Sequence, residues 1–170
     1  MKILALSGSL RTASINSAFL RAAAELSPVH IKVSVYTGLG ALPLFNPDIE
    51  AAPPHPVRDF QAQVSASDAV LIASPEYAHG ITGTIKNALD WLVGYEPFAG
   101  KRVAVVNTSS RARHADEALR EILSTMAARI VDGASITIPL LGTHTNERAM
   151  LESPAVKQAI QQIWAALDEK

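Results

Sequence analysis

The stretch Ile3-Leu4-Ala5-Leu6-Ser7-Gly8-Ser9, near the amino terminus, decides the fold class of this chain. Its apolar residues follow one another without alternation, which is typical of a strand buried on both faces of a parallel sheet. Polar and small residues come next, and apolar residues then recur at helical spacing from Ile15 to Leu26. Pro28 lies just past the end of that pattern. This part of the chain therefore predicts a buried strand, a polar loop and a helix.

The same succession of strand, loop and helix recurs along the rest of the chain. Further strands are predicted over residues 31–35, 69–73, 103–106 and 135–138, and further helices over residues 57–67, 81–92, 115–130 and 156–167. The second strand alternates with polar residues, so we expect it near an edge of the sheet. Residues 38–56 are rich in Gly and Pro and form one long connection. Five such units predict a single α/β domain over residues 1–170, with a parallel sheet and helices on both of its faces.

Composition and charge exclude several classes of protein. Of the 170 residues, 48% are hydrophobic and 18% are charged, which is typical of a folded globular chain. The chain has no cysteine, so disulfides, thiolate catalysis, iron–sulfur clusters and Cys-ligated zinc are excluded. His114 and Glu117 are one helical turn apart but lack a third ligand, so we expect no metal site. The net charge of -1 argues against nucleic acid as a partner, because phosphate binding needs a basic surface.

We expect a cytoplasmic protein without a membrane partner. No apolar run is long enough to span a bilayer. The amino terminus has one basic residue and a very short apolar run, and it lacks the longer apolar region and the cleavage site of a signal peptide.

The loop over residues 7–17 is the first candidate binding element. Ligands of open parallel sheets bind beyond the carboxyl ends of the strands, and a helix N-terminus there attracts phosphate. Ser9, Thr12, Ser14 and Ser17 add hydroxyl groups, and Arg11 adds a positive charge. With one glycine and no Gly-Lys-Ser/Thr, the loop is neither a dinucleotide fingerprint nor a Walker loop. It suits a terminal phosphate monoester; the alternative is that its serines only cap the helix and that Arg11 is solvated.

Two further loops follow buried strands at the same edge of the predicted sheet. In the loop over residues 74–83, Pro75 adds stiffness, and glycines allow a ligand to approach the backbone closely. Tyr77 offers an aromatic face for a planar ring, although it could equally pack on the surface of a tight turn. In the loop over residues 107–113, Ser109, Ser110 and Arg111 are possible donors. An ordinary capped helix start explains that third loop equally well.

Three segments together resemble one known family. They are Gly8-Ser9-Leu10-Arg11-x-x-Ser14-x-Asn16, the run LPLFNPD at residues 42–48, and the run SPEYAHGITGTIKNALDW at residues 74–91. In this order they are similar to the NADPH-dependent FMN reductase family, and the resemblance covers most of the chain. It implies a flavodoxin-like three-layer sandwich with a five-stranded parallel sheet in the order 2-1-3-4-5. It also implies FMN as cofactor and NADPH or NADH as co-substrate.

The resemblance assigns roles to residues of this chain. Five residues would hold the FMN phosphate, four would line the isoalloxazine ring, and two would approach the other edge of the ring. These are, in turn, Ser9, Arg11, Ser14, Asn16 and Ser17; Pro75, Glu76, Tyr77 and Ala78; and Ser109 and Ser110. The chain departs from the family pattern at Ala78, where Asn is frequent, and in its third loop, which is commonly glycine-rich in relatives.

The implied activity is an NAD(P)H oxidoreductase with ping-pong hydride transfer to flavin N5 and onward transfer to a small acceptor. FMN, a quinone, an azo compound or a metal oxyanion would each serve as that acceptor. No dedicated catalytic residue is expected, because the cofactor carries the chemistry. Relatives are usually homodimers or homotetramers, and Trp91 and Tyr95 are either interface or core aromatics. A flavodoxin-type electron carrier and a non-catalytic flavin-binding module are the alternatives, and the roles of His79 and of the loop from Ser109 to Arg113 stay open.

Overall fold

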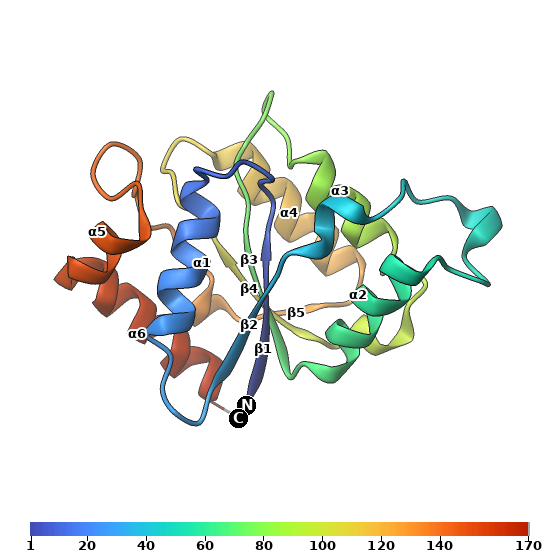
Figure 1. The fold of residues 1–170 in the computed structure, drawn as a ribbon, viewed down its shortest axis with the longest axis horizontal. Helices are drawn as coiled ribbons and strands as arrows, with labels where there is room; N and C mark the ends of the chain where they lie inside the picture. The colour runs from blue at the N-terminus through green and yellow to red at the C-terminus, as the bar shows by residue number, and fades with distance from the viewer. Residues whose placement is uncertain (170) are drawn as a thin grey trace.

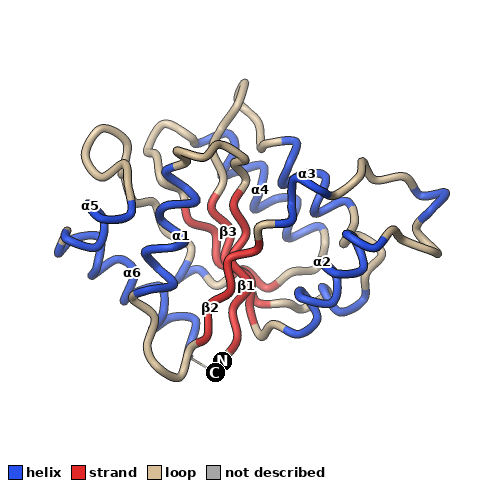
Figure 2. The backbone as a smooth tube through the Cα atoms, in the orientation of Figure 1, coloured by secondary structure: helices blue, strands red, loops and turns tan. Residues whose placement is uncertain are grey.

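Five parallel strands form the central sheet, in the order β2-β1-β3-β4-β5 (Figures 1 and 2). The strands are β1 (Lys2–Ser7), β2 (Lys32–Tyr36), β3 (Ala69–Ala73), β4 (Arg102–Val106) and β5 (Arg129–Ile130). The computed structural model describes residues 1–169 of the chain. In the centre of the sheet, Ala5 of β1 pairs with Val35 on one side and with Leu71 on the other. The predicted flavodoxin-like strand order is confirmed.

Helices cover both faces of the sheet and make the predicted three layers (Figure 1). One face carries α1 (Ile15–Glu25), α5 (Glu147–Glu152) and α6 (Pro154–Asp168), and the other carries α2 (His55–Ala66), α3 (Gly83–Asp90) and α4 (Arg113–Thr125). Short 3-10 turns lie at Gly38–Ala41, Pro47–Ile49, Glu96–Phe98 and Asp132–Ala134. No helix within residues 1–169 is long and apolar enough to cross a bilayer.

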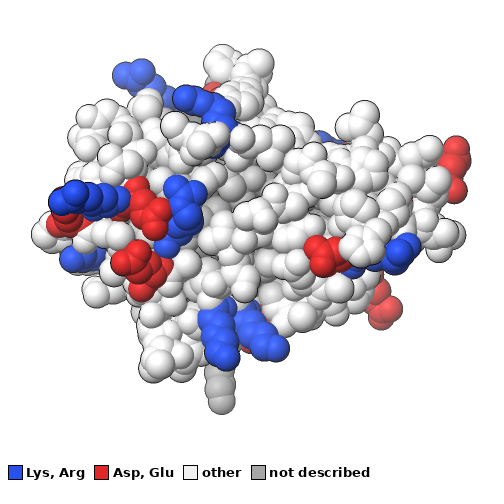
Figure 3. Space-filling model, in the orientation of Figure 1, with Lys and Arg blue, Asp and Glu red and all other residues white. Residues whose placement is uncertain are grey.

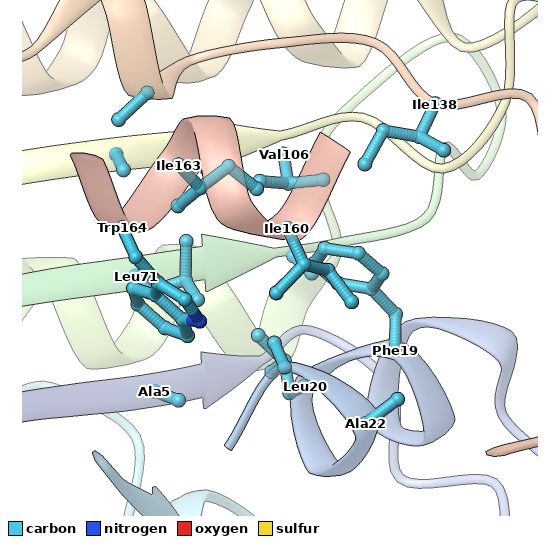
Figure 4. Close-up of a cluster of buried hydrophobic side chains, with 14 of the residues drawn as sticks. Ala5, Phe19, Leu20, Ala22, Leu71, Val106, Ile138, Ile160, Ile163 and Trp164 are labelled. Carbon is cyan, nitrogen blue, oxygen red and sulfur yellow. The ribbon is translucent and has the colours of Figure 1, made fainter. Parts of the chain in front are cut away.

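The two hydrophobic layers follow from the alternation of side chains along each strand. Successive residues of a strand point to opposite faces, so Ala5 and Leu4 belong to different layers. On the first face, Phe19 of α1 and Ile160 and Trp164 of α6 pack over the sheet, as Figure 4 shows. All residues of β3 are fully buried, as its uninterrupted apolar run predicts. The edge strand β2 alternates between exposed and less exposed residues, which is also as predicted.

The predicted last strand forms only as a parallel bridge between Thr137 and Asn107, and the predicted end of the helix before it is wrong. The helix was expected to reach residue 130, but α4 ends at Thr125, and Ala127 adopts a left-handed backbone with φ of 56° just after it. The chain therefore reverses early and Ile130 enters β5 instead. Residues 135–138 continue that edge without forming a named strand; Ile138 N donates to Asn107 O, beyond the end of β4. The short helix α5 was not predicted.

The long connection between β2 and α2 is fastened to α3. The side chain of Asn87 accepts a 2.8 Å hydrogen bond from Phe45 N and donates one of 3.0 Å to Pro43 O. Trp91 Nε1 donates to the same Pro43 oxygen at 2.8 Å, and the Phe45 ring meets the Trp91 ring edge-on. Trp91 is 2% exposed and so belongs to the core of the chain rather than to its surface. The two sequence runs that contain these residues are therefore one structural unit.

Candidate functional site

A pocket of about 750 Å³ lies beyond the carboxyl ends of the strands, where strand order reverses between β1 and β3. Its walls are the loops that follow β1, β3 and β4, together with Leu141, Thr145 and Asn146 from the segment before α5. The volume lies in the range of sites for small molecules and cofactors. The lining combines hydroxyl, amide and guanidinium groups with apolar and aromatic side chains, which suits a ligand that is polar at one end and flat at the other.

Most of the predicted site residues are brought together in this pocket. Eight of the eleven line it: Ser9, Arg11, Ser14, Asn16, Pro75, Glu76, Tyr77 and Ser109. The other three, Ser17, Ala78 and Ser110, are not part of its lining. The roles assigned to all eleven stay predictions.

Several lining residues were not predicted as site residues. Asn107 and Thr108 come directly after β4, where the rule that ligands lie beyond strand ends would have found them. Leu141, Thr145 and Asn146 come after the predicted strand over residues 135–138, so the same rule would have pointed to them, but the sequence analysis considered only the loops after the first, third and fourth strands. Arg111, predicted only as a possible donor, also lines the pocket.

Gly8 lets the first loop lie directly against the second. Its N–H donates a 2.9 Å hydrogen bond to Ala73 O at the end of β3. A Cβ added at Gly8 would lie 2.0 Å from Ser74 Oγ and 2.8 Å from Ile85 Cγ1, closer than real Cβ atoms come. A glycine is needed here for the close approach of two of the loops whose residues line the pocket.

The start of α1 offers hydroxyl donors to the pocket. Ser14 is the N-cap and accepts a 3.2 Å hydrogen bond from Ser17 N, and Ser9 Oγ accepts from Arg11 N. In the contacts within residues 1–169, neither hydroxyl donates to a protein acceptor, so each can donate to a ligand. The hydroxyl of Ser17 instead bonds with that of Ser7 at 2.7 Å, and Ser17 is not part of the lining.

Asn16 connects the first loop with the third. It is buried, and its Oδ1 accepts a 2.9 Å hydrogen bond from Thr108 Oγ1. The third loop is itself braced by Asn107, which donates to Ala112 O and accepts from Ser109 N, each at 3.0 Å. These contacts fix the two loops relative to each other across the pocket.

The second loop carries a tight hairpin at its tip. Tyr77 and Gly80 exchange backbone hydrogen bonds of 3.1 and 3.0 Å, and the two residues between them, Ala78 and His79, have φ of 49° and 58°. A left-handed backbone at a residue with a Cβ costs about 1–2 kcal/mol. Asn tolerates that conformation better, so Ala78 adds strain where the family often has Asn. The turn leaves Tyr77 half exposed at the rim of the pocket.

This hairpin is held against α4 at two points. Glu76 Oε2 accepts a 2.9 Å hydrogen bond from Ala115 N in the first turn of α4. The ring of His79 stacks on that of His114, with centroids 4.5 Å apart. The N-cap of α4 is Ala112, which has no side-chain acceptor, so the carboxylate of Glu76 takes over that task from another loop.

Glu76 is therefore expected to stabilise the fold as a helix cap. Glu76→Ala should lower the free energy of unfolding by about 1–2 kcal/mol, the usual cost of a lost cap. Glu76→Gln keeps an acceptor oxygen and should lose only the charge contribution, about 0.3–1 kcal/mol. Urea unfolding followed by circular dichroism measures both variants. An unfolding midpoint of Glu76→Ala equal to that of the wild type would contradict the capping role.

Comparisons with known proteins agree with this geometry. The model of the family described as NADPH-dependent FMN reductase matches residues 1–141. An NAD(P)H-dependent FMN reductase of Pseudomonas aeruginosa is 39% identical over 113 residues, which are 65% of this chain and 60% of that relative. A quinone reductase of Pseudomonas putida is 42% identical over 111 residues, which are 62% of this chain and 58% of that relative. The chain thus covers less than two thirds of the length of either relative.

Solved structures share the whole fold. The flavoenzyme NAD(P)H:(acceptor) oxidoreductase FerB of Paracoccus denitrificans superposes with a TM-score of 0.81 at 25% identity, covering 98% of this chain and 95% of that one. A flavodoxin of Pseudomonas aeruginosa superposes with a TM-score of 0.62 at 17% identity, over 99% of this chain and 100% of that one. The fold and the pocket at its switch point define a flavodoxin-like α/β protein. Within that class, the chain belongs to the NADPH-dependent FMN reductase family, as its motifs predict.

Proposed function

We propose that this chain is an FMN-dependent oxidoreductase that takes electrons from NADPH or NADH and passes them to a small acceptor. The observation that supports this most is the pocket in which the hydroxyl- and arginine-bearing loop after β1 meets the Tyr77 loop after β3. The names of the relatives, an FMN reductase and a quinone reductase, support free FMN or a quinone as the acceptor.

The donor set suits the phosphate end of FMN. Ser9 and Ser14 can each donate a hydroxyl hydrogen, and Arg11 lines the same wall with its positive charge. These groups surround the amino end of α1, where the free backbone N–H groups of the helix favour an anion. A phosphate monoester dianion would be bound there by charge and by hydrogen bonds together.

The other side of the pocket suits a flat ring. Pro75 is rigid and Tyr77 is aromatic, and Ala112 and Leu141 add apolar surface from two other segments. Because Tyr77 is exposed, this side is accessible to a second flat molecule. The electron donor NAD(P)H and the electron acceptor would bind there one after the other. The chemistry that bound FMN supplies is acceptance of a hydride from NAD(P)H and release of the electron pair to the acceptor. The residues of the chain bind and orient the reactants and need not act as acids or nucleophiles.

Arg11→Ala should weaken FMN binding by about 1.5–3 kcal/mol, which is roughly tenfold or more in the dissociation constant. The physical reason is the loss of a charge-assisted hydrogen bond to the phosphate. Quenching of flavin fluorescence on titration measures the affinity, and riboflavin, which lacks the phosphate, is the matched ligand. We expect the affinity for riboflavin to change little; an unchanged affinity for FMN would contradict the assignment of Arg11.

We further propose that the chain forms a homodimer or a homotetramer that covers Leu44. This side chain is 83% exposed, although the residues on either side of it are fixed to Asn87 and Trp91. A second copy that covered this side chain would gain the free energy of burying its apolar surface. Light scattering coupled to gel filtration should give at least twice the mass of one chain, and Leu44→Glu should lower it. A monomer mass for the wild type would contradict the proposal.

The proposed activity is tested by steady-state oxidation of NADPH and NADH by the FMN-loaded protein with a quinone as acceptor. Because donor and acceptor would share one open side of the pocket, we expect ping-pong kinetics, with parallel lines in double-reciprocal plots. Oxidation of neither nucleotide under these conditions would contradict the proposal.

A further inference from the structure

The third loop, residues 107–113, brings positive charge to the pocket. Binding of the FMN phosphate by the first loop does not explain this charge. Arg111 lines the pocket, and Arg113 begins α4. In the contacts within residues 1–169, neither guanidinium makes a hydrogen bond or an ion pair with the protein. By contrast, Arg21 and Arg120 are paired with Glu147 and Asp116 at 2.7 and 2.8 Å.

Among the ion pairs of residues 1–169, none includes Arg111 or Arg113. Glu76 is the acidic residue among those that line the pocket, and it accepts a hydrogen bond from Ala115 N. Asp116 is bound to Arg120 at 2.8 Å and so is already paired. Figure 3 shows basic side chains and very little acidic surface at the upper end of the molecule, where the loops beyond the strands lie. The arginines are therefore available to an anion from solution.

The backbone that carries these arginines is fixed before a ligand arrives. Asn107 braces the loop through Ser109 N and Ala112 O, and Ser109 Oγ accepts a 3.3 Å hydrogen bond from Arg111 N. The first turn of α4 is held by Glu76 and by the stacked rings of His79 and His114. Such preorganisation lowers the entropy cost of binding.

The two arginines of the pocket stand on different walls. Arg11 follows β1 and Arg111 follows β4, and β3 lies between these strands. Adjacent strands are about 4.8 Å apart, so the two loops leave the sheet about 10 Å from each other. If Arg11 serves the phosphate of FMN, Arg111 is placed for a second anionic group at the far side of the pocket.

We propose that Arg111, with Arg113 beside it, binds a phosphate group of the reduced nicotinamide nucleotide. This inference rests on the proposed function and gives the third loop of this chain a role in recognising the co-substrate. The ligand chemistry is a phosphate of NADPH, either its 2′-phosphate or the pyrophosphate that NADH also carries. Arginine suits both, because its planar guanidinium matches phosphate oxygens and keeps its charge.

The test compares co-substrates that differ in their phosphates. FMN-loaded wild type, Arg111→Ala, Arg113→Ala and Arg111→Lys are assayed with NADPH, NADH and dihydronicotinamide riboside, which has no phosphate. Arg129→Ala removes the same charge from an exposed site at the start of β5, at the opposite end of the sheet, and is the matched control. Binding of NADP+ to the same FMN-loaded samples is measured by calorimetry, so that the result does not depend on turnover.

For Arg111→Ala we expect the KM for NADPH to rise roughly tenfold or more with kcat little changed, the signature of lost ground-state binding. The affinity for NADP+ should fall by a similar factor, Arg113→Ala should show a smaller effect, and Arg111→Lys should restore part of the loss. If the KM of Arg111→Ala rises for NADPH alone, Arg111 binds the 2′-phosphate. If it rises equally for NADH, Arg111 binds the pyrophosphate. In Arg111→Ala, the KM for the riboside and the affinity for FMN should match those of the wild type. The control variant Arg129→Ala should match the wild type in every measurement.

Two results would overturn the proposal. One is an unchanged KM and NADP+ affinity in Arg111→Ala. The other is an equal loss with the phosphate-free riboside, or a loss of FMN, because Arg111 would then act on the flavin. Failure of the proposed function looks different: the wild type would oxidise none of the three donors. Arginine-dependent binding of NADP+ would then still support the phosphate subsite.

Discussion

Gly8→Ala is expected to destabilise the protein by about 3 kcal/mol or more, which is the upper end of what overpacking costs. It should also abolish tight FMN binding. The added Cβ would lie 2.0 Å from Ser74 Oγ, 2.6 Å from Ser74 Cβ and 2.8 Å from Ile85 Cγ1. Ile85 is 1% exposed, so it has no free space into which to move. The first and second loops must therefore separate, which disturbs two of the loops that line the pocket. Urea unfolding and fluorescence titration with FMN measure the two effects.

Gly83→Ala is the matched control for this change. Gly83 is the first residue of α3, and nothing lies within 4 Å of a Cβ added there. Because Ala is a better helix former than Gly, this variant should be as stable as the wild type or up to about 1 kcal/mol more stable. Wild-type stability and FMN affinity in Gly8→Ala would show that the two loops are not in close contact.

Trp91→Ala is expected to cost about 3–5 kcal/mol of stability and to release the connection between β2 and α2. The indole is buried, packs edge-on against Phe45 and donates a hydrogen bond to Pro43 O. Its removal leaves a cavity and takes away one of the two hydrogen bonds to Pro43 O, the other being that from Asn87. Unfolding by urea gives the loss of stability, and limited proteolysis should cut the chain within residues 42–54 faster than in the wild type.

Trp91→Phe separates packing from hydrogen bonding at the same position. It keeps an aromatic ring against Phe45 but loses the donor to Pro43 O, so we expect a cost nearer to 1–2 kcal/mol than to that of Ala, roughly one hydrogen bond and a small change in volume. Equal unfolding midpoints for the wild type and Trp91→Ala, with no faster cleavage, would contradict the clamp.

The fold was largely readable from the sequence because buried parallel strands lack alternation. The uninterrupted apolar run Ala69–Ala73 coincides with strand β3 at both ends. The polar residues Lys32 and Ser34, which alternate with valines, indicated that β2 lies at an edge of the sheet. The end of α4 was not readable, because apolar residues at helical spacing continue past Thr125 to Ile130. The left-handed backbone of Ala127 that ends the helix carries no sequence signal of the kind that a glycine gives.

The site was predictable as far as it consists of loops after strands. Ser9, Arg11 and Tyr77 stand in such loops and do line the pocket. Contacts between loops were not predictable, because the partners are distant in sequence. The bond from Ala115 N to Glu76 and the stack of His79 on His114 join segments 39 and 35 residues apart, and only the folded chain brings them together.

The central claim is that NADPH or NADH reduces FMN bound to this chain. The most direct test mixes the FMN-loaded protein with each nucleotide under anaerobic conditions and follows the visible absorbance of the flavin. We predict rapid bleaching by the protein alone, and return of the colour when a quinone is added. A flavin that keeps its colour until a separate reductase is supplied would contradict the claim and would favour an electron carrier.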